Sequence, residues 1–197
     1  MILSLSPAPK HGVCRGIVTL LACAVLMAVP VPAGAAPVAS ATQTSTTAVK
    51  KSSDFPDVDW IVCEINKERA VNGVPALTIV DRASTVAKAH AADMFQMNKL
   101  TSIGSDGRTL RDRLTDAGIY SRLIEEFMFY GYKNNEYFAD MATDNTPSNT
   151  FYKALMSQDI AAFGMGEDNM YTDVILLGYH RRLVQRDAVC EDSASLG

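Results

Sequence analysis

Apolar side chains recur at helical spacing after the first quarter of the chain. The first apolar stripe consists of Val58, Ile61, Val62 and Ile65. This spacing predicts a helix over residues 58–71, with Asp57 as its N-cap and the Asn-Gly pair at 72–73 as its C-cap. A second stripe predicts a helix over residues 81–98 that Asp81 caps.

The second half of the chain alternates short helical and extended stretches and ends in a predicted hairpin. The short elements are a helix from the Thr109–Asp112 capping box to Gly118, an aromatic strand or loop at 125–132, and helices at 136–143 and 146–157. Two β-rich arms at 160–165 and 171–179 flank a polar turn at 166–169, which predicts a β-hairpin. Helices followed by a closing hairpin, without βαβ alternation, predict an α+β layered domain.

The amino-terminal segment has the pattern of a secretion signal. Lys10 and Arg15 precede an uncharged run at 16–31, and Ala-Gly-Ala at 33–35 supplies the small residues that a signal peptidase reads. The run contains Pro30 and falls short of the roughly 20 apolar residues that a membrane-spanning helix needs. We therefore expect cleavage after residue 35, secretion, and no membrane span after cleavage. A membrane anchor is the alternative.

Composition divides the remaining chain into a linker, one domain and a tail. The chain has 197 residues, a suitable length for one domain beside a targeting segment. Residues 36–56, rich in Ala, Ser and Thr, predict a flexible linker, residues 57–190 the domain, and residues 191–197 a tail. After cleavage 16 basic residues remain against 22 acidic ones, a formal charge of −6. This charge excludes an electrostatic surface for nucleic acid.

Two of the four cysteines, Cys63 and Cys190, lie in the predicted domain. An even pair in a secreted protein predicts a disulfide, which would tie the end of the chain to the first helix. The bridge would close a loop of 126 intervening residues (190 − 63 − 1). The chain-entropy account gives such a loop a stabilisation of about 4 to 5 kcal/mol. Two buried free thiols are the alternative.

Four short segments, through their order and spacing, carry a resemblance to a known family. They are Asn-Lys-Glu-Arg-Ala at 66–70, Val-Pro-Ala-Leu at 74–77, His-Ala-Ala-Asp-Met at 90–94 and Gly-Ser-Asp-Gly at 104–107. The chain resembles the CAP superfamily of SCP-like extracellular domains (cysteine-rich secretory, antigen-5 and pathogenesis-related-1 proteins), in particular its short microbial and fungal branch. The resemblance covers about residues 58–179 and is weaker in the second half. It implies a three-layer α-β-α sandwich with a small antiparallel sheet.

Many members of this family carry two histidines and two acidic residues in a central cleft that sometimes holds zinc. At the corresponding positions this chain has Ser102 and Asn149 in place of the histidines and Glu126 as the first acid. The second acid has no assigned counterpart, and whether Asp173 adds an acid to the cleft stays open. Ser and Asn are weak neutral ligands, so the resemblance implies a degenerate site with no metal and no cofactor.

The remaining chemistry-bearing residues predict structural roles. His90 lies on the apolar side of its helix, where family members often have a histidine outside the cleft, and is interpreted as a structural histidine. Glu125 and Glu126 point to opposite faces of an extended segment, so they do not form an acid–base pair with each other. We therefore expect no catalytic activity. A residual hydrolase would have to use Glu126 with Ser102 and Asn149.

An excess of apolar side chains leaves two binding roles open. Phe127, Phe129 and Tyr130 either line a groove for a sterol or fatty acid, ligands that some family members bind, or belong to the core. The main hypothesis is a secreted monomer that binds a protein or cell-surface partner. An extracellular sterol or fatty-acid carrier is the alternative, and a residual hydrolase is the third hypothesis.

Overall fold

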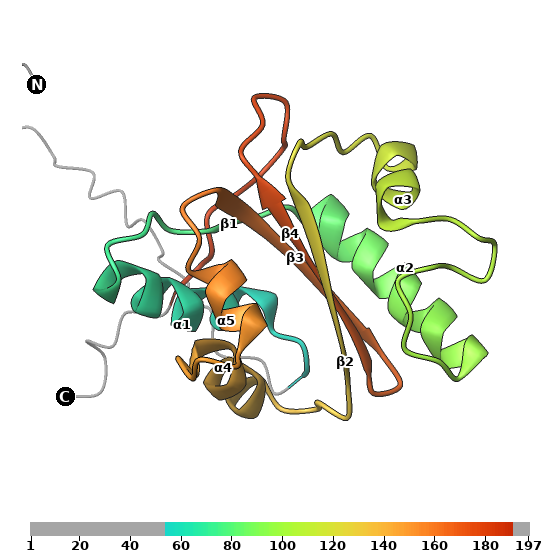
Figure 1. Cartoon of the computed structure of the whole chain (residues 1–197), viewed down its shortest axis with the longest axis horizontal. Coiled ribbons are helices and arrows are strands. Elements are labelled where there is room, and N and C mark those ends of the chain that lie inside the picture. Colours follow the sequence, from blue (N-terminus) through green and yellow to red (C-terminus); the bar gives the residue numbers. More distant parts are fainter. Residues whose placement is uncertain (1–53, 191–197) are drawn as a thin grey trace, which may run out of the picture. The chain divides into compact units, whose positions relative to one another are not determined.

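The computed structural model describes residues 54–190. The predicted signal segment 1–35, the linker up to residue 53 and the tail 191–197 lie outside the described residues. The elements are, in chain order, α1 (Val58–Val71), β1 (Thr78–Ile79), α2 (Asp81–Met97), α3 (Leu110–Asp116), β2 (Ile124–Tyr130), α4 (Asn135–Thr143), α5 (Thr150–Leu155), β3 (Ile160–Asp168) and β4 (Tyr171–Gly178) (Figure 1). Across residues 54–190, every helix is too short or too polar to cross a membrane.

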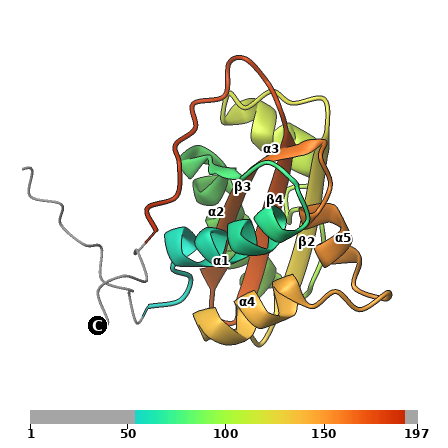
Figure 2. The same ribbon diagram turned by 90° about the vertical axis from the view of Figure 1, so that its left-hand side faces the viewer.

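The four strands form one sheet in the order β1-β3-β4-β2. β3 and β4 pair antiparallel as the predicted hairpin, and β2 pairs antiparallel with the other edge of β4. β1 joins β3 in parallel, which the prediction of an antiparallel sheet did not include. Helices α1, α4 and α5 cover one face of the sheet, and α2 and α3 cover the other (Figure 1, Figure 2). The three α-β-α layers implied by the resemblance are confirmed.

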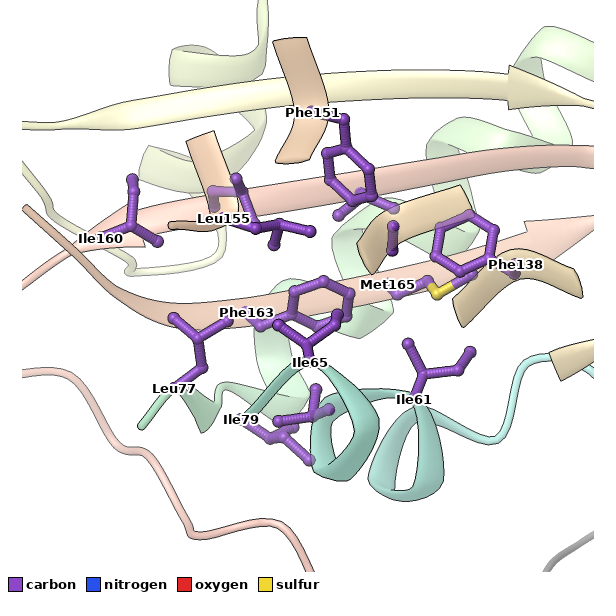
Figure 3. Packing of buried hydrophobic residues seen from close by; sticks show 14 residues of the cluster. Ile61, Ile65, Leu77, Ile79, Phe138, Phe151, Leu155, Ile160, Phe163 and Met165 are labelled. Atoms are coloured by element: carbon purple, nitrogen blue, oxygen red, sulfur yellow. The ribbon is translucent and has the colours of Figure 1, made fainter. Parts of the chain in front are cut away.

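Side chains alternate across the strands and build one hydrophobic layer on each face of the sheet. The layer under α1, α4 and α5 includes Ile61, Ile65, Phe138, Phe151, Leu155, Phe163 and Met165 (Figure 3). The layer under α2 and α3 includes Ala83, Ala87, Leu110, Leu114, Ile175 and Leu177. The first layer is rich in aromatic rings and the second in small aliphatic side chains, so α2 lies close to the sheet.

Two glycines of β3 allow this close approach of α2. A Cβ atom at Gly166 would lie 2.2 Å from the Lys88 amide nitrogen, and one at Gly164 would lie 2.6 Å from the Ala83 Cβ atom. Both distances are shorter than any ordinary contact between non-bonded atoms, so these two positions require glycine for steric reasons.

Two polar residues of α1, both in the Asn-Lys-Glu-Arg-Ala segment at 66–70, have structural roles. The Asn66 side chain pairs with both backbone groups of Leu77, at 3.0 and 2.7 Å. Arg69 is fully buried and donates hydrogen bonds to the carbonyl oxygens of Pro75 and Ile160, at 2.7 and 3.0 Å. Burial lowers the pKa of Arg69 to about 10, which still leaves the guanidinium charged at neutral pH. These bonds position the connector after α1 and the start of β3.

Most predicted elements are confirmed, and three details differ. The helix predicted over residues 146–157 is shorter, because α5 spans Thr150–Leu155 with Asn149 as its N-cap. Asp57 caps α1 by accepting a hydrogen bond from the Trp60 amide, as predicted. Asp81 is the first residue of α2, and Val80 occupies the cap position. The hairpin turn lies at Asn169 and Met170, beyond most of the predicted turn at 166–169, because Gly166 is a strand residue that faces α2.

The predicted disulfide between Cys63 and Cys190 is confirmed, with the two Cα atoms 5.6 Å apart. Arg186 holds the same carboxy-terminal segment through hydrogen bonds to Asp59, at 2.6 and 2.9 Å, and to Asp81, at 3.0 Å. The end of the described chain is therefore tied to α1 and to the start of α2.

Candidate functional site

Ionisable side chains from four elements meet between the sheet and the α2–α3 layer. His90 comes from α2, Arg113 from α3, Glu126 from β2 and Asp173 from β4. We refer to His90, Glu126 and Asp173 as the polar cluster. One ligand-type atom of each lies within 4.8 Å of the other two. The polar cluster is the candidate site.

The strand register brings the two acids of the polar cluster together. Glu126 pairs with Ile175 and Met128 pairs with Asp173, so Glu126 and Asp173 are diagonal neighbours on β2 and β4. Because successive strand residues face opposite sides, Glu126 points toward α2 and α3 while Phe127 points toward the other layer.

His90 is held in one tautomer by the loop that follows α2. Its Nε2 atom lies 2.8 Å from the Thr101 carbonyl oxygen, which can only accept a hydrogen bond. The proton of the neutral ring is therefore on Nε2, and Nδ1 carries the lone pair. Burial and then the charge of Arg113 lower the pKa of His90, so the ring is neutral at pH 7.

Burial raises the pKa of both carboxyl groups of the polar cluster. Asp173 is fully buried, and burial, together with the neighbouring Glu126 carboxylate, raises its pKa well above the usual value. Burial also raises the pKa of Glu126, although the Arg113 charge opposes this. Since a carboxylate cannot donate a hydrogen bond, the contact is satisfied when Asp173 keeps a proton and donates it to Glu126.

Arg113 closes the polar cluster on the α3 side. Its Nη2 atom forms an ion pair with Glu126 Oε1, and 10% and 6% of the two side chains are exposed. Its Nη1 atom donates to the carbonyl oxygens of Ser102 and Arg108, at 3.0 and 3.1 Å. The guanidinium thus neutralises Glu126 and separates it from solvent.

The structure separates the three positions taken from the family resemblance. Ser102 is exposed and contributes its backbone carbonyl oxygen to Arg113, which also binds Glu126. Asn149 caps α5 and donates to the Met141 carbonyl oxygen at 2.8 Å, in the helical layer on the opposite face of the sheet. Ser102, Glu126 and Asn149 therefore do not form a common set of metal ligands.

Two residues lie beside Glu126 that the sequence did not assign to the site. His90 is buried and hydrogen-bonded, in keeping with the structural role expected of it, and its ring also lies beside Glu126. Asp173, which the sequence left open as an acid of the cleft, is the second carboxyl group of the polar cluster. An aspartate in the middle of the apolar strand β4 was the available signal, because such a buried acid needs a partner.

Two of the three aromatic residues suggested for a lipid groove are half-buried and pack against the core. Phe127 contacts Phe151, with ring centroids 4.9 Å apart, and Phe129 contacts Phe138 at 5.5 Å. Strand alternation explains this placement, because odd-numbered residues of β2 face the α4–α5 layer. Tyr130, at the end of β2, is instead 57% exposed.

Tyr130 borders a surface pocket of about 740 Å³ beside the tip of the β3–β4 hairpin. We call it the hairpin pocket; it is lined by Asp54, Phe55, Phe95, Asn98, Tyr130, Lys133, Glu167, Asn169, Met170 and Tyr171. The ring of Tyr171 lies 4.9 Å from that of Tyr130 and 6.3 Å from that of Phe95. The hairpin pocket therefore combines aromatic walls with polar and charged groups.

Comparison with known proteins places these features in a family. The model of the cysteine-rich secretory protein family, CAP, matches residues 62–175. The fold is similar to that of an extracellular protein containing an SCP domain from Bacillus anthracis str. Ames, with a TM-score of 0.54, 19% identity, and coverage of 60% of this chain and 39% of that one.

A cysteine-rich secretory protein from Staphylococcus aureus subsp. aureus Mu50 is also similar, with a TM-score of 0.50, 14% identity, and coverage of 60% of this chain and 37% of that one. The aligned region therefore covers well under half of the length of the Bacillus anthracis protein and of the Staphylococcus aureus protein. No curated protein sequence matches the chain.

Proposed function

The chain belongs to the cysteine-rich secretory protein (CAP) family, and on this premise we propose that it acts outside the cell by binding a protein or cell-surface partner, without catalysis. The Cys63–Cys190 bridge supports an extracellular location, because structural disulfides persist in oxidising compartments.

The proposal rests on the exposed aromatic side chains of the hairpin pocket. Tyr130 and Phe95 are 57% and 45% exposed, and both line the pocket beside Met170. Tyr, Phe and Met are enriched in protein interfaces, where a few large side chains contribute most of the binding free energy. Asn98 and Lys133 supply polar groups of the kind found at the rim of such interfaces.

Hydrogen bonds also connect the segments that line the hairpin pocket. The Tyr171 hydroxyl donates to Asn98 Oδ1 at 3.0 Å, and the Gly131 amide donates to the Met170 carbonyl oxygen at 2.9 Å. Met170 has a φ of 77°, a left-handed conformation that is unusual for this residue type and that the hairpin turn imposes. A preorganised surface loses less conformational entropy on binding, which favours affinity.

The same features argue against the two other roles. Lipid carriers use mainly apolar cavities, whereas half of the residues that line the hairpin pocket are polar or charged. A hydrolytic role for Glu126 would require access to water, and its side chain is 6% exposed and paired with Arg113.

The test measures sedimentation of the labelled, secreted protein with intact cells of the producing organism. We expect saturable binding by the wild-type protein and at least about tenfold weaker binding by Tyr130→Ser, the loss typical of an interface aromatic. Tyr179→Ser is the matched control, because Tyr179 is also a largely exposed tyrosine but does not line the hairpin pocket.

Equal binding by the wild-type protein and both variants would contradict the role of the hairpin pocket. A sterol or fatty acid that co-purifies with the protein in native mass spectrometry would favour the carrier. An esterase or peptidase activity that Glu126→Ala abolishes, while the variant stays folded, would favour the hydrolase.

A further inference from the structure

We propose that a second pocket, at the other end of the sheet from the hairpin pocket, binds a small soluble phosphate monoester. This pocket has a volume of about 190 Å³ and lies where α3, the loop before β2 and the segment after β4 meet. Because Arg111, Arg122 and His180 line it, we call it the basic pocket. Ile124, at the start of β2, borders the basic pocket, whereas Tyr130, at the end of β2, borders the hairpin pocket. The inference is therefore independent of the proposed function.

The two arginines of the basic pocket have no carboxylate partner. Across residues 54–190, neither Arg111 nor Arg122 forms an ion pair, and none of the described residues that line the basic pocket is acidic. The aspartates of α3 are engaged elsewhere, because Asp112 forms the capping box and Asp116 pairs with Arg108 at 2.5 Å. A bound anion would offset the repulsion between the two uncompensated positive charges.

The two guanidinium groups retain most of their hydrogen-bond donors. Arg111 Nη1 donates to the Ser121 carbonyl oxygen at 3.4 Å, and this contact brings Arg111 to the residue that precedes Arg122. A guanidinium has five N–H groups in a planar fork, so Arg111 keeps donors for a ligand. This fork matches two oxygens of a phosphate group and forms short, charge-assisted hydrogen bonds with them.

The other polar groups of the basic pocket are also hydrogen-bond donors. His180 Nδ1 accepts a hydrogen bond from the Arg182 amide at 3.3 Å, so the proton of the neutral ring is on Nε2, which can donate to a ligand. The hydroxyl groups of Thr115 and Tyr120 lie at the same pocket. Such a set of donors suits a ligand that has several acceptor oxygens.

Charge and size narrow the ligand to a small phosphate monoester. A phosphate monoester carries a charge of about −1.5 to −2 at pH 7, which matches two guanidinium groups better than the single charge of a carboxylate or a sulfate ester. Leu114, Ile119 and Ile124 provide apolar walls that would contact the carbon part of the ligand. The volume of about 190 Å³ lies below the range of about 300 to 1,000 Å³ that is usual for pockets of drug-sized ligands, so the carbon part is compact.

The test titrates the secreted protein with phenyl phosphate, which joins a phosphate monoester to one compact ring. We expect saturable binding with a Kd of about 1 mM or lower by ligand-observed NMR. Phenyl sulfate has the same ring with less charge and should bind at least about fivefold more weakly, because the electrostatic attraction scales with charge. Vesicles of phosphatidylcholine and phosphatidic acid present the same phosphate group on a lipid. Sedimentation with these vesicles that phenyl phosphate displaces would identify a lipid headgroup as the source of the phosphate.

Variants at the two exposed arginines test the site itself. Arg111→Gln and Arg122→Gln should each weaken phenyl phosphate binding about tenfold or more, because each removes a charged donor. Arg122→Lys keeps the charge without the fork, so its affinity should lie between those of the wild-type protein and Arg122→Gln. Arg181→Gln is the matched control, because Arg181 is an exposed arginine next to His180 that does not line the basic pocket. Its affinity should stay within about twofold of the wild-type value, since solvent and salt screen an exposed charge outside the pocket.

Saturable binding that both glutamine variants of the basic pocket weaken and Arg181→Gln retains would support the proposal. A folded wild-type protein that does not bind phenyl phosphate would overturn it, even if the protein sediments with the vesicles. Equal affinity for phenyl sulfate, or an equal loss in Arg181→Gln, would show a general attraction of anions and would also overturn it. None of these results depends on Tyr130 or on sedimentation with cells, so the basic pocket and the proposed function can fail separately.

Discussion

The Arg113 guanidinium of α3 forms an ion pair with the Glu126 carboxylate of β2 at a place where both side chains are nearly buried. Arg113 also holds the loop before α3 through the carbonyl oxygens of Ser102 and Arg108. The same loop holds His90 through Thr101. One arginine therefore joins α3, this loop and the sheet around the polar cluster.

Replacing Arg113 should strongly destabilise the fold. Arg113→Met leaves the Glu126 carboxylate in a buried position without its cation, so we expect the free energy of unfolding to fall by about 3 to 5 kcal/mol. Urea denaturation of the chelator-treated protein would measure it. Arg111→Met is the matched control, since Arg111 is an exposed residue of the same helix, and it should change stability by about 0.5 kcal/mol or less.

The double variant Arg113→Met/Glu126→Gln tests the cause of this loss. It removes the unpaired charge, so it should be more stable than Arg113→Met alone. If the single and double variants unfold at the same urea concentration, the destabilisation comes mainly from the lost hydrogen bonds between Arg113 and the loop. The unpaired charge of Glu126 is then not its main cause.

A Cβ atom at Gly166 should prevent α2 from docking on β3. The added atom of Gly166→Ala would overlap the backbone of Lys88, which cannot turn aside as a side chain can. We expect a loss of about 3 kcal/mol or more in the free energy of unfolding. Gly73→Asn is the contrast, because Gly73 has a φ of 68° but open space around it, and Asn tolerates this conformation. A Gly166→Ala protein with wild-type stability would show that α2 can move away at little cost.

Much of the fold follows from local patterns in the sequence. The apolar stripe of α1, its Asp57 cap and the capping box of α3 are decided by neighbours in the chain, so their bounds could be predicted. The turn was misplaced because Gly166 has the composition of a turn residue, whereas a long-range contact with α2 is what requires it. The parallel pairing of β1 with β3 likewise depends on tertiary packing, and a strand of two residues is too short for its sequence to predict it.

The candidate site was harder to predict because its members are distant in sequence. Glu126 was found through the resemblance, but its neighbours His90 and Asp173 become neighbours only through the β2–β4 register and the docking of α2. Asn149 stands where the family pattern has a histidine, but its side-chain amide caps α5 and binds the Met141 carbonyl oxygen. The sequence therefore indicated one acid of the polar cluster, left Asp173 open, and did not place His90 beside them.

Asp59 should make the stability of the fold sensitive to acid. Burial raises the pKa of Asp59, but hydrogen bonds from Arg186 and from the Val189 amide, with the Arg186 charge, outweigh burial and lower the pKa in the folded state. A carboxyl with a lowered folded pKa contributes stability above its unfolded pKa of about 4. That contribution is lost as pH falls through the folded pKa.

Thermal unfolding between pH 7 and pH 2 would measure this contribution. Asp59→Asn should be less stable than the wild-type protein at pH 7, and the difference should shrink toward pH 2. Arg186→Gln should reduce the pH dependence in the same direction, because it removes the cation that lowers the pKa. A constant difference between Asp59→Asn and the wild-type protein at every pH would contradict the role of this carboxylate.

The bridge between Cys63 and Cys190 should stabilise the fold mainly by restricting the unfolded chain. In Cys63→Ala/Cys190→Ala the unfolded state is free of a loop whose ends are 127 residues apart, so we expect a loss of about 4 kcal/mol in the free energy of unfolding. The hydrogen bonds from Arg186 to Asp59 do not need the bridge, and they should keep the carboxy-terminal segment docked. Adding Arg186→Gln should therefore release that segment more in the bridge-free protein than in the wild-type protein, as read by amide hydrogen exchange at residues 186–189. If the bridge-free protein already exchanges freely there, the disulfide alone holds the segment, and the Arg186 bonds form only because the bridge brings them together.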